Sequence, residues 1–289
     1  MKLGIAVDSR VCMACYCCFM ACKDEHCGYD SKLSKAQPMM GQKWIDVHEW
    51  ERGTSSRRVK TASVASLCAH CEKPACMNVA KDGAVYKRPD GIVIVDPEKS
   101  KGQKAIADSC PMMHWNEELE IPQKCTMCAE LLDDPEYVKY LGDPSLKKPR
   151  CVEACPNKAL YFGDMDDPNS EISKFMASGA RETPPHESLI GDDTNVKWFN
   201  VPTVYLAGTV MQPKELDEVL VGAKVKLSCK ETGETWETET NYFGDWEVEW
   251  LPKNKSIDVV IEAAGYKAAT YTAQTDIDRY VDMTYMAKA

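Results

Sequence analysis

The stretch CMACYCCFMAC, residues 12–22, decides how the first half of this chain folds. It places cysteines at positions 12, 15, 18 and 22, a Cys-x2-Cys-x2-Cys-x3-Cys spacing. Three closely spaced thiolates can wrap one face of a four-iron cubane, whereas the fourth is carried onto the next turn and points to a neighbouring cluster. The spacing therefore predicts one half of a pair of [4Fe–4S] sites.

The remaining cysteines extend this pattern. Of 15 cysteines in 289 residues, all but Cys229 lie between Cys12 and Cys155. Three further groups follow the first: Cys68-x2-Cys71-x4-Cys76, a single Cys110 before Pro111, and Cys125-x2-Cys128 with a long insert before Cys151-x3-Cys155-Pro156. The last group repeats the run of residues 12–22 with an insertion after its second cysteine. We therefore expect the groups to exchange their final cysteines in pairs, as in bacterial two-cluster ferredoxins.

This exchange predicts three complete ligand sets. The first group pairs with the last, and the second pairs with the third. The sets are Cys12, Cys15, Cys18 and Cys155 for cluster 1, Cys22, Cys125, Cys128 and Cys151 for cluster 2, and Cys68, Cys71, Cys76 and Cys110 for cluster 3. Twelve cysteines would thus hold three [4Fe–4S] clusters.

A fourth cluster site is expected to be vacant. Its ligands would stand at the positions that are occupied by Ala80, Ser100, Gln103 and Ile106. All four ligands are missing together, while the other three sets are intact. The pattern indicates that one whole cluster has been lost, because scattered loss would have left broken sites.

Zinc is the alternative metal for any single Cys-x2-Cys pair, but zinc sites use two separated pairs, and the close triplets with Cys-Pro favour iron–sulfur. We expect the three cysteines outside the sets to be structural: Cys17, Cys27 and Cys229. His70 is expected to donate a hydrogen bond near cluster 3. Lys23 and Lys124 adjoin ligands, and they are either ordinary solvated lysines or cations that raise a cluster potential.

Composition excludes several classes of protein. A net charge of −10 opposes binding to nucleic acid, and no apolar run approaches the ~20 residues of a membrane span, so no direct membrane insertion is expected. The N-terminus lacks a signal-peptide pattern, which predicts a reducing, cytoplasmic location unless a partner's signal exports the chain. No nucleotide-binding fingerprint and no catalytic constellation is present, so we predict no catalytic residues.

The sequence predicts an α+β chain in three parts. Residues 1–161 form a double ferredoxin-like cluster domain, residues 162–200 a turn-rich connector, and residues 201–289 an all-β sandwich. In the last part, apolar and polar residues alternate over three runs, residues 223–229, 246–250 and 257–263. Such alternation is typical of antiparallel strands with one buried face, and about seven short strands fit a sandwich.

Four stretches of the cluster domain point to a family: CAHCEKPAC, GAVYKRPDGIVIVDPEKSKG, HWNEE and QKCTMCAELLDD. Together with the cysteine groups and the β-domain they resemble the iron–sulfur subunits of dimethyl-sulfoxide-reductase-type molybdopterin oxidoreductases. Within that family the resemblance is to the small subunits of pyrogallol–phloroglucinol transhydroxylases and related anaerobic catechol and phenol (de)hydroxylases. The C-terminal part is similar to carboxypeptidase-regulatory-like and Cna-B-like modules.

The resemblance implies a heterodimer, alone or within a higher assembly, with a large catalytic subunit that carries a molybdenum or tungsten bis-pterin cofactor. Cluster 1 would lie nearest that subunit, and the vacant site corresponds to the distal cluster of respiratory relatives. Two other functions are open at this point. The chain could be a free-standing polyferredoxin, or a subunit whose clusters mainly hold the fold.

Overall fold

The computed structural model describes residues 1–28, 30–183 and 193–289, and the chain divides into two compact units. The first unit comprises Met1–Glu49 and Ser63–Val201, and the second comprises Trp50–Ala62 and Pro202–Ala289. The first contains all of the predicted cluster ligands. Among the described helices, none is long and apolar enough to cross a membrane.

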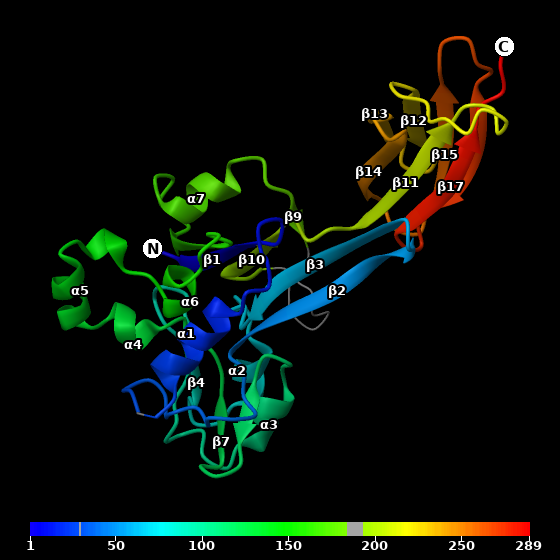
Figure 1. Ribbon diagram of the computed structural model, residues 1–289. Helices are drawn as coiled ribbons and strands as arrows, with labels where there is room; N and C mark the ends of the chain where they lie inside the picture. Colours follow the sequence, from blue (N-terminus) through cyan, green and yellow to red (C-terminus); the bar gives the residue numbers. More distant parts are fainter. Residues whose placement is uncertain (29, 184–192) are drawn as a thin grey trace. The chain divides into compact units, whose positions relative to one another are not determined.

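The first unit contains a four-stranded sheet in the order β8-β1-β10-β9 (Figure 1). Its strands are β1 (Leu3–Asp8), β8 (Leu160–Asp164), β9 (Glu182–Thr183) and β10 (Val196–Phe199). β1 pairs antiparallel with β8 and parallel with β10, so the start of the chain is held between two late segments. Helix α7 (Glu171–Met176) covers this sheet, and its Phe175 ring stacks on Tyr161 with ring centroids 4.0 Å apart.

The segment that we expected to be a connector therefore contributes β9, β10 and α7, and β8 ends in it. Short runs such as Val196–Phe199 carry no periodic signal by themselves and become strands only because β1 offers a partner. Residues 184–192 of that segment lie outside the described part of the chain.

Short elements surround the ligand loops of the first unit. They are α1 (Cys17–His26), α2 (Ala75–Val79), β4 (Val85–Lys87), β5 (Val93–Val95), α3 (Lys104–Asp108), β6 (His114–Asn116) and β7 (Ile121–Gln123). β4 pairs with β5 and β6 with β7, and both pairs are antiparallel. β2 (Ile45–Ser55) and β3 (Arg58–Leu67) form a separate two-stranded sheet. The apolar run Ile92–Val95 forms strand β5 from Val93 onward.

The insert between Cys128 and Cys151 is helical. It contains α4 (Ala129–Leu132), α5 (Pro135–Leu141), the 3-10 helix η1 (Pro144–Leu146) and the start of α6 (Arg150–Glu153). The two Asp-Pro pairs begin helices, because Asp134 and Asp143 accept hydrogen bonds from the backbone N–H groups of Glu136 and Ser145.

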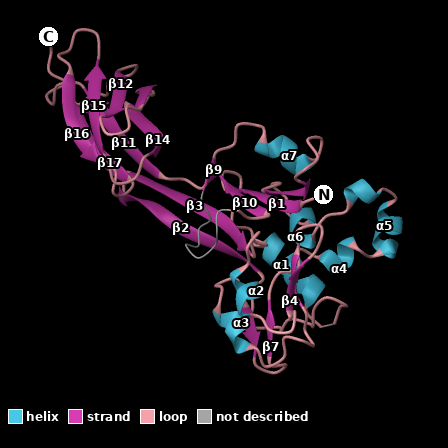
Figure 2. Ribbon diagram, turned by 180° about the vertical axis from the view of Figure 1, so that it is seen from behind, coloured by secondary structure: helices cyan, strands magenta, loops and turns pink. Residues whose placement is uncertain are grey.

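The described part of the second unit contains a three-stranded sheet, β14-β11-β17, and a four-stranded sheet, β13-β12-β15-β16 (Figure 2). Their strands are β11 (Val204–Met211), β12 (Lys224–Cys229), β13 (Thr235–Glu239), β14 (Asp245–Leu251), β15 (Ser256–Glu262), β16 (Ala269–Gln274) and β17 (Arg279–Tyr285). Apolar side chains from both sheets form one core, among them Leu206, Leu227 and Val259. The two predicted runs in β12 and β15 bury the expected alternate residues.

Two features of these sheets differ from the predicted pattern. β11 pairs with β17 in parallel, although all pairs were expected to be antiparallel. In β14 the alternation breaks after Val248: Leu251 is fully buried, and Trp250 adopts a left-handed φ of 64°. The register between β11 and β14 shifts at the same place, so a β-bulge moves the inward position from Trp250 to Leu251.

Candidate metal centres

The loops that begin at Cys12, Cys68 and Cys125 share one backbone feature. The residue before the second cysteine of the pair has a left-handed φ in each loop: 53° at Ala14, 46° at His70 and 55° at Met127. None of these residues is glycine, and such a conformation costs a residue with a side chain of order 1–3 kcal/mol. This shared strain is a signature of the loops that the cysteine spacing alone does not reveal.

Helix α1 explains why Cys18 and Cys22 belong to different sets. Cys18, Cys22 and His26 follow one another at four-residue intervals, and all three side chains are buried on one face of the helix. One turn of helix α1 therefore separates Cys18, which is assigned to set 1, from Cys22, which is assigned to set 2. The loop before α1 supplies Cys12 and Cys15, of which Cys15 is exposed.

The thiols of set 1 lie near one another. Burial raises the pKa of Cys18 to about 12, and the charges of Cys12, Cys155 and Cys15 act in the same direction. The backbone N–H of Ala159 donates to the Cys155 sulfur at 3.2 Å. An N–H donor of this kind stabilises a thiolate that carries metal charge.

The thiols of set 2 are the most deeply buried. Burial raises the pKa of Cys22 well above its usual value, and the charges of Cys125 and Cys128 add to the effect. The pKa of Cys151 is raised by burial and by Cys125 and Cys22. These mutual effects place all four sulfur atoms within one small region.

A buried histidine contacts this second set. His26 Nε2 lies 3.6 Å from the Cys128 sulfur, and its Nδ1 lies 3.1 Å from Glu130 Oε1. The Trp44 ring packs over the imidazole, with ring centroids 4.8 Å apart. Burial acts to raise the pKa of Glu130, but the hydrogen bond and charge of His26 outweigh it, so the pKa lies below its usual value. Glu130 therefore orients the imidazole beside the Cys128 sulfur.

The four thiols of set 3 line one cavity of about 60 Å³, together with His70, Lys124 and Met113. Burial raises the pKa of Cys76 to about 12; the charge of Lys124 opposes this effect, whereas those of Cys68, Cys110 and Cys71 reinforce it. Four thiols around one hollow, with N–H donors on its wall, suit a four-iron cluster.

The three sets form a row. Burial is the main cause of the raised pKa values of Cys22 and Cys151 in set 2, and the charge of Cys18 in set 1 adds to it. Burial raises the pKa of Cys125 to about 12, and the next contribution comes from Cys68 of set 3. Set 2 therefore stands between the other two sets.

The residues at the predicted vacant position fill space instead of leaving a ligand cage. Ile106 is fully buried in an apolar cluster that also contains Val95 and the partly buried Ala80. The Gln103 side chain accepts from the Lys81 N–H and donates to the Lys99 carbonyl, and Ser100 is buried. Ile106 and Ala80 thus pack in an apolar cluster, and local hydrogen bonds hold the Gln103 side chain.

The remaining cysteines have separate surroundings. The pKa of the half-buried Cys17 is raised mainly by a hydrogen bond with the Cys15 thiol, and burial adds to this effect. The Cys27 sulfur lies 3.7 Å from the Pro38 carbonyl, and Cys229 packs in the β-domain core. Within the described ranges, no three His, Cys, Asp or Glu side chains converge tightly enough to hold a single metal ion.

Comparison with known proteins identifies the class. The 4Fe-4S dicluster domain matches residues 59–165. Among the relatives, the pyrogallol hydroxytransferase small subunit of Pelobacter acidigallici is 35% identical and covers 98% of this chain and 97% of its own length. A sulfite dehydrogenase subunit of Allochromatium vinosum is 34% identical over 60% of this chain and 72% of its own length. One component of the anaerobic dimethyl sulfoxide reductase of Escherichia coli is 31% identical over 74% and 98%.

These matches identify the chain as a [4Fe–4S] protein. It belongs to the family of iron–sulfur electron-transfer subunits of molybdopterin oxidoreductases, as its resemblance predicted. The similarity to the pyrogallol hydroxytransferase small subunit extends over nearly the entire chain. Likeness to solved structures is limited, with a TM-score of 0.27 and 20% identity to the Bacillus anthracis TIE protein over 35% of this chain and 19% of that one.

Proposed function

We propose that this chain relays electrons through three [4Fe–4S] clusters to or from a large subunit with a molybdenum or tungsten bis-pterin cofactor. The complex would act on hydroxylated aromatic compounds, by transhydroxylation or dehydroxylation. The clusters supply one-electron storage and transfer, and the bond chemistry belongs to the partner's cofactor. This chain's own residues ligate the clusters, exclude water and present the first cluster to the partner.

The clustering of the thiols carries this proposal. The four thiols of set 3 line one cavity, those of set 2 are all buried, and helix α1 links set 1 to set 2 through Cys18 and Cys22. A continuous row suits electron transfer better than three isolated structural centres would.

The aromatic substrate class is supported by the extent of the similarity. The hydroxytransferase small subunit matches 98% of this chain, whereas the sulfite dehydrogenase and dimethyl sulfoxide reductase relatives match 60% and 74%. The added length is of the same order as the share of the chain that residues 201–289 occupy. We assign this domain to residues 201–289, with a Cna-B-like or carboxypeptidase-regulatory-like fold.

The surface beside set 1 suits the large subunit. Cys15 is exposed, and Met13, Tyr16 and Met20 around it expose 63%, 37% and 60% of their surface. Exposed methionine next to a redox centre provides an adaptable apolar contact for a partner protein. We therefore place cluster 1 at the interface of a heterodimer.

Anaerobic co-purification tests the proposal. The chain should be isolated with a large subunit in equal amounts, with molybdenum or tungsten, and with about twelve irons per small subunit. A monomer with the same iron content would instead indicate a free-standing polyferredoxin, and clusters that never change redox state in turnover would indicate a structural role.

Single substitutions sharpen this test. Cys110→Ser should lower the iron content by about four atoms per chain, because it removes a ligand of cluster 3. The matched control is Cys229→Ser, a buried thiol outside the sets, which should leave the iron content unchanged. About sixteen irons per chain, or zinc in place of iron, would contradict the three-cluster assignment.

A further inference from the structure

Lys124 is a buried cation without an anionic protein partner among the described residues. Its side chain is 4% exposed, and its ammonium donates to the backbone carbonyls of Val93 and Cys125. Within the described residues, no carboxylate lies at ion-pair distance from it. Burial of an uncompensated ammonium is costly, so a stable fold requires a nearby negative charge.

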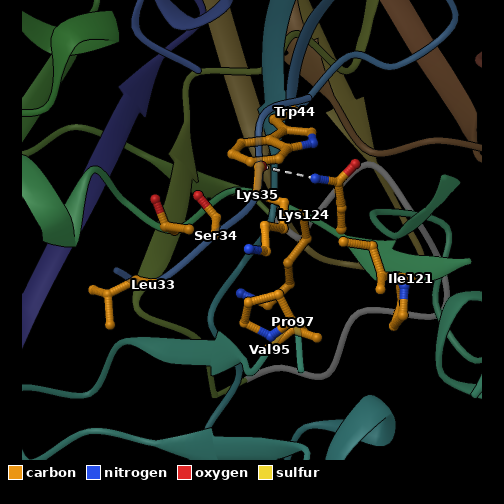
Figure 3. Close-up of a pocket in the computed structure, with 11 residues that line it drawn as sticks. Leu33, Ser34, Lys35, Trp44, Val95, Pro97, Ile121 and Lys124 are labelled. Carbon is orange, nitrogen blue, oxygen red and sulfur yellow. Dashed lines mark hydrogen bonds between the residues drawn. The ribbon is translucent and has the colours of Figure 1, made fainter. Parts of the chain in front are cut away.

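The surroundings of Lys124 indicate where that charge lies. The residue lines the set 3 cavity together with Cys76 and Cys110. In the sequence it directly precedes Cys125 of set 2. Figure 3 shows the other side of Lys124, where its side chain extends between Trp44 and the segment of Val95 and Pro97. The cation thus stands at the junction of sets 2 and 3.

His70 adds a second donor to the same cavity. The residue is fully buried, and its Nδ1 accepts a hydrogen bond from the Val93 N–H at 3.0 Å. A neutral imidazole with an accepting Nδ1 carries its proton on Nε2. Nε2 has no hydrogen-bond partner among the described residues, although the residue lines the cavity. An unpaired N–H group on the wall of a thiol cage is suited to donate to a cluster sulfur.

We propose that Lys124 and His70 make cluster 3, held by Cys68, Cys71, Cys76 and Cys110, the cluster of highest reduction potential in this chain. Each one-electron reduction adds a negative charge, which a buried cation and an N–H donor stabilise. Set 3 also stands at the end of the row, beside the position that lacks fourth-cluster ligands. An electron that reaches it is retained, so this end of the molecule acts as an electron reservoir. The inference rests on the proposed three-cluster function.

The test is a potentiometric titration of the intact, anaerobically purified complex, followed by electron paramagnetic resonance. The cluster 3 signal is assigned by its loss in Cys110→Ser. In the native protein this signal should develop first as the potential falls. In Lys124→Met the ratio of reduced to oxidised cluster 3 at a fixed potential should fall at least tenfold, equivalent to about 59 mV for one electron.

Three further variants separate charge from packing. Lys124→Arg keeps the cation and should retain the native order of reduction, and His70→Phe should lower the reduced fraction of cluster 3 severalfold. Lys87→Met is the matched control, because the Lys87 ammonium is already paired with Glu72 at 2.6 Å, and its loss should change the ratio less than twofold.

The outcomes are distinct. Reduction of cluster 1 or 2 before cluster 3, or an unchanged ratio in Lys124→Met with full iron content, would overturn the inference. If Lys124→Met fails to assemble its clusters, the test rests on His70→Phe. An unchanged ratio of reduced to oxidised cluster 3 in that variant would also overturn the inference. Absence of a cluster 3 signal from the native protein, with iron well below about twelve per chain, would instead reject the proposed function.

Discussion

Glu247 in the β-domain shows how one side chain can organise several charges. Its carboxylate accepts from Arg58 Nε at 2.6 Å and also from Lys60, which in turn reaches Glu249. Burial alone would raise the pKa of Glu247, but the hydrogen bonds from Lys60 and Arg58 outweigh it, so the pKa lies below its usual value of 4.5. The carboxylate therefore stabilises the folded β-domain in its charged form.

Glu247→Gln should destabilise the β-domain by about 1 kcal/mol at pH 7, after allowance for solvent screening of a partly exposed group. A pKa lowered on folding gives stability that is present above the unfolded value and is lost as the pH falls through the folded one. The difference between native and variant proteins should therefore be full at pH 7 and shrink below about pH 4.5. Amide hydrogen exchange of β14 measures it. A difference that grows in acid would exclude this role.

At the scale of residues, the sequence predicts features that depend on local spacing, but it does not predict contacts between distant residues. The grouping of Cys12, Cys15 and Cys18 is visible because a ligand loop is a local structure. The contact of His26 with Glu130 was not predicted, because the two residues lie far apart in the sequence and carry no joint pattern. The left-handed φ of Ala14 was not predicted either, because alanine rarely adopts this conformation and its presence does not indicate it.

At the scale of elements, Gly53 in β2 allows the hairpin to approach a neighbouring strand. Its φ is 118°, and a Cβ atom there would lie 2.4 Å from the Arg58 carbonyl oxygen and 2.5 Å from the Tyr205 hydroxyl. That hydroxyl donates to the same carbonyl at 2.9 Å. Only glycine leaves room for this hydrogen bond.

Gly53→Ala should therefore destabilise the second unit by about 2 kcal/mol or more, from a strained backbone and a displaced tyrosine. The matched control is Gly233→Ala, where φ is 75° but nothing lies within 4 Å of the added carbon, so backbone strain alone should cost about 1 kcal/mol. Urea unfolding of both variants, followed by exchange of β11 amides, compares them. Equal losses would show that the Tyr205 contact has no influence.

The same scale explains which strands were predictable. β12 and β15 alternate regularly and were predicted with their buried residues. The bulge at Trp250 was not, because alternation extrapolates a regular register and cannot detect an inserted residue. The sheet strand β10 was missed because it depends on a partner at the opposite end of the first unit's sequence.

At the scale of the whole molecule, the proposed interface around the exposed Cys15 can be tested by substitution. Met20→Glu should lower the yield of co-purified large subunit at least tenfold, because a charge would be buried against an apolar contact. Tyr140→Glu, a substitution of an exposed apolar residue on α5, should leave the complex intact. Native gel analysis with metal content reads both. Full recovery of the complex with Met20→Glu would move the interface elsewhere.

The parallel pairing of β1 with β10 sets an order of events during synthesis. Residues 3–8 leave the ribosome early, yet their partner, Val196–Phe199, emerges only after every predicted ligand has been made. The edge between β1 and β10 can therefore close only after about two-thirds of the polypeptide has been translated, when all twelve predicted ligands are already present. An early stop before β10 would leave β1 paired with β8 alone.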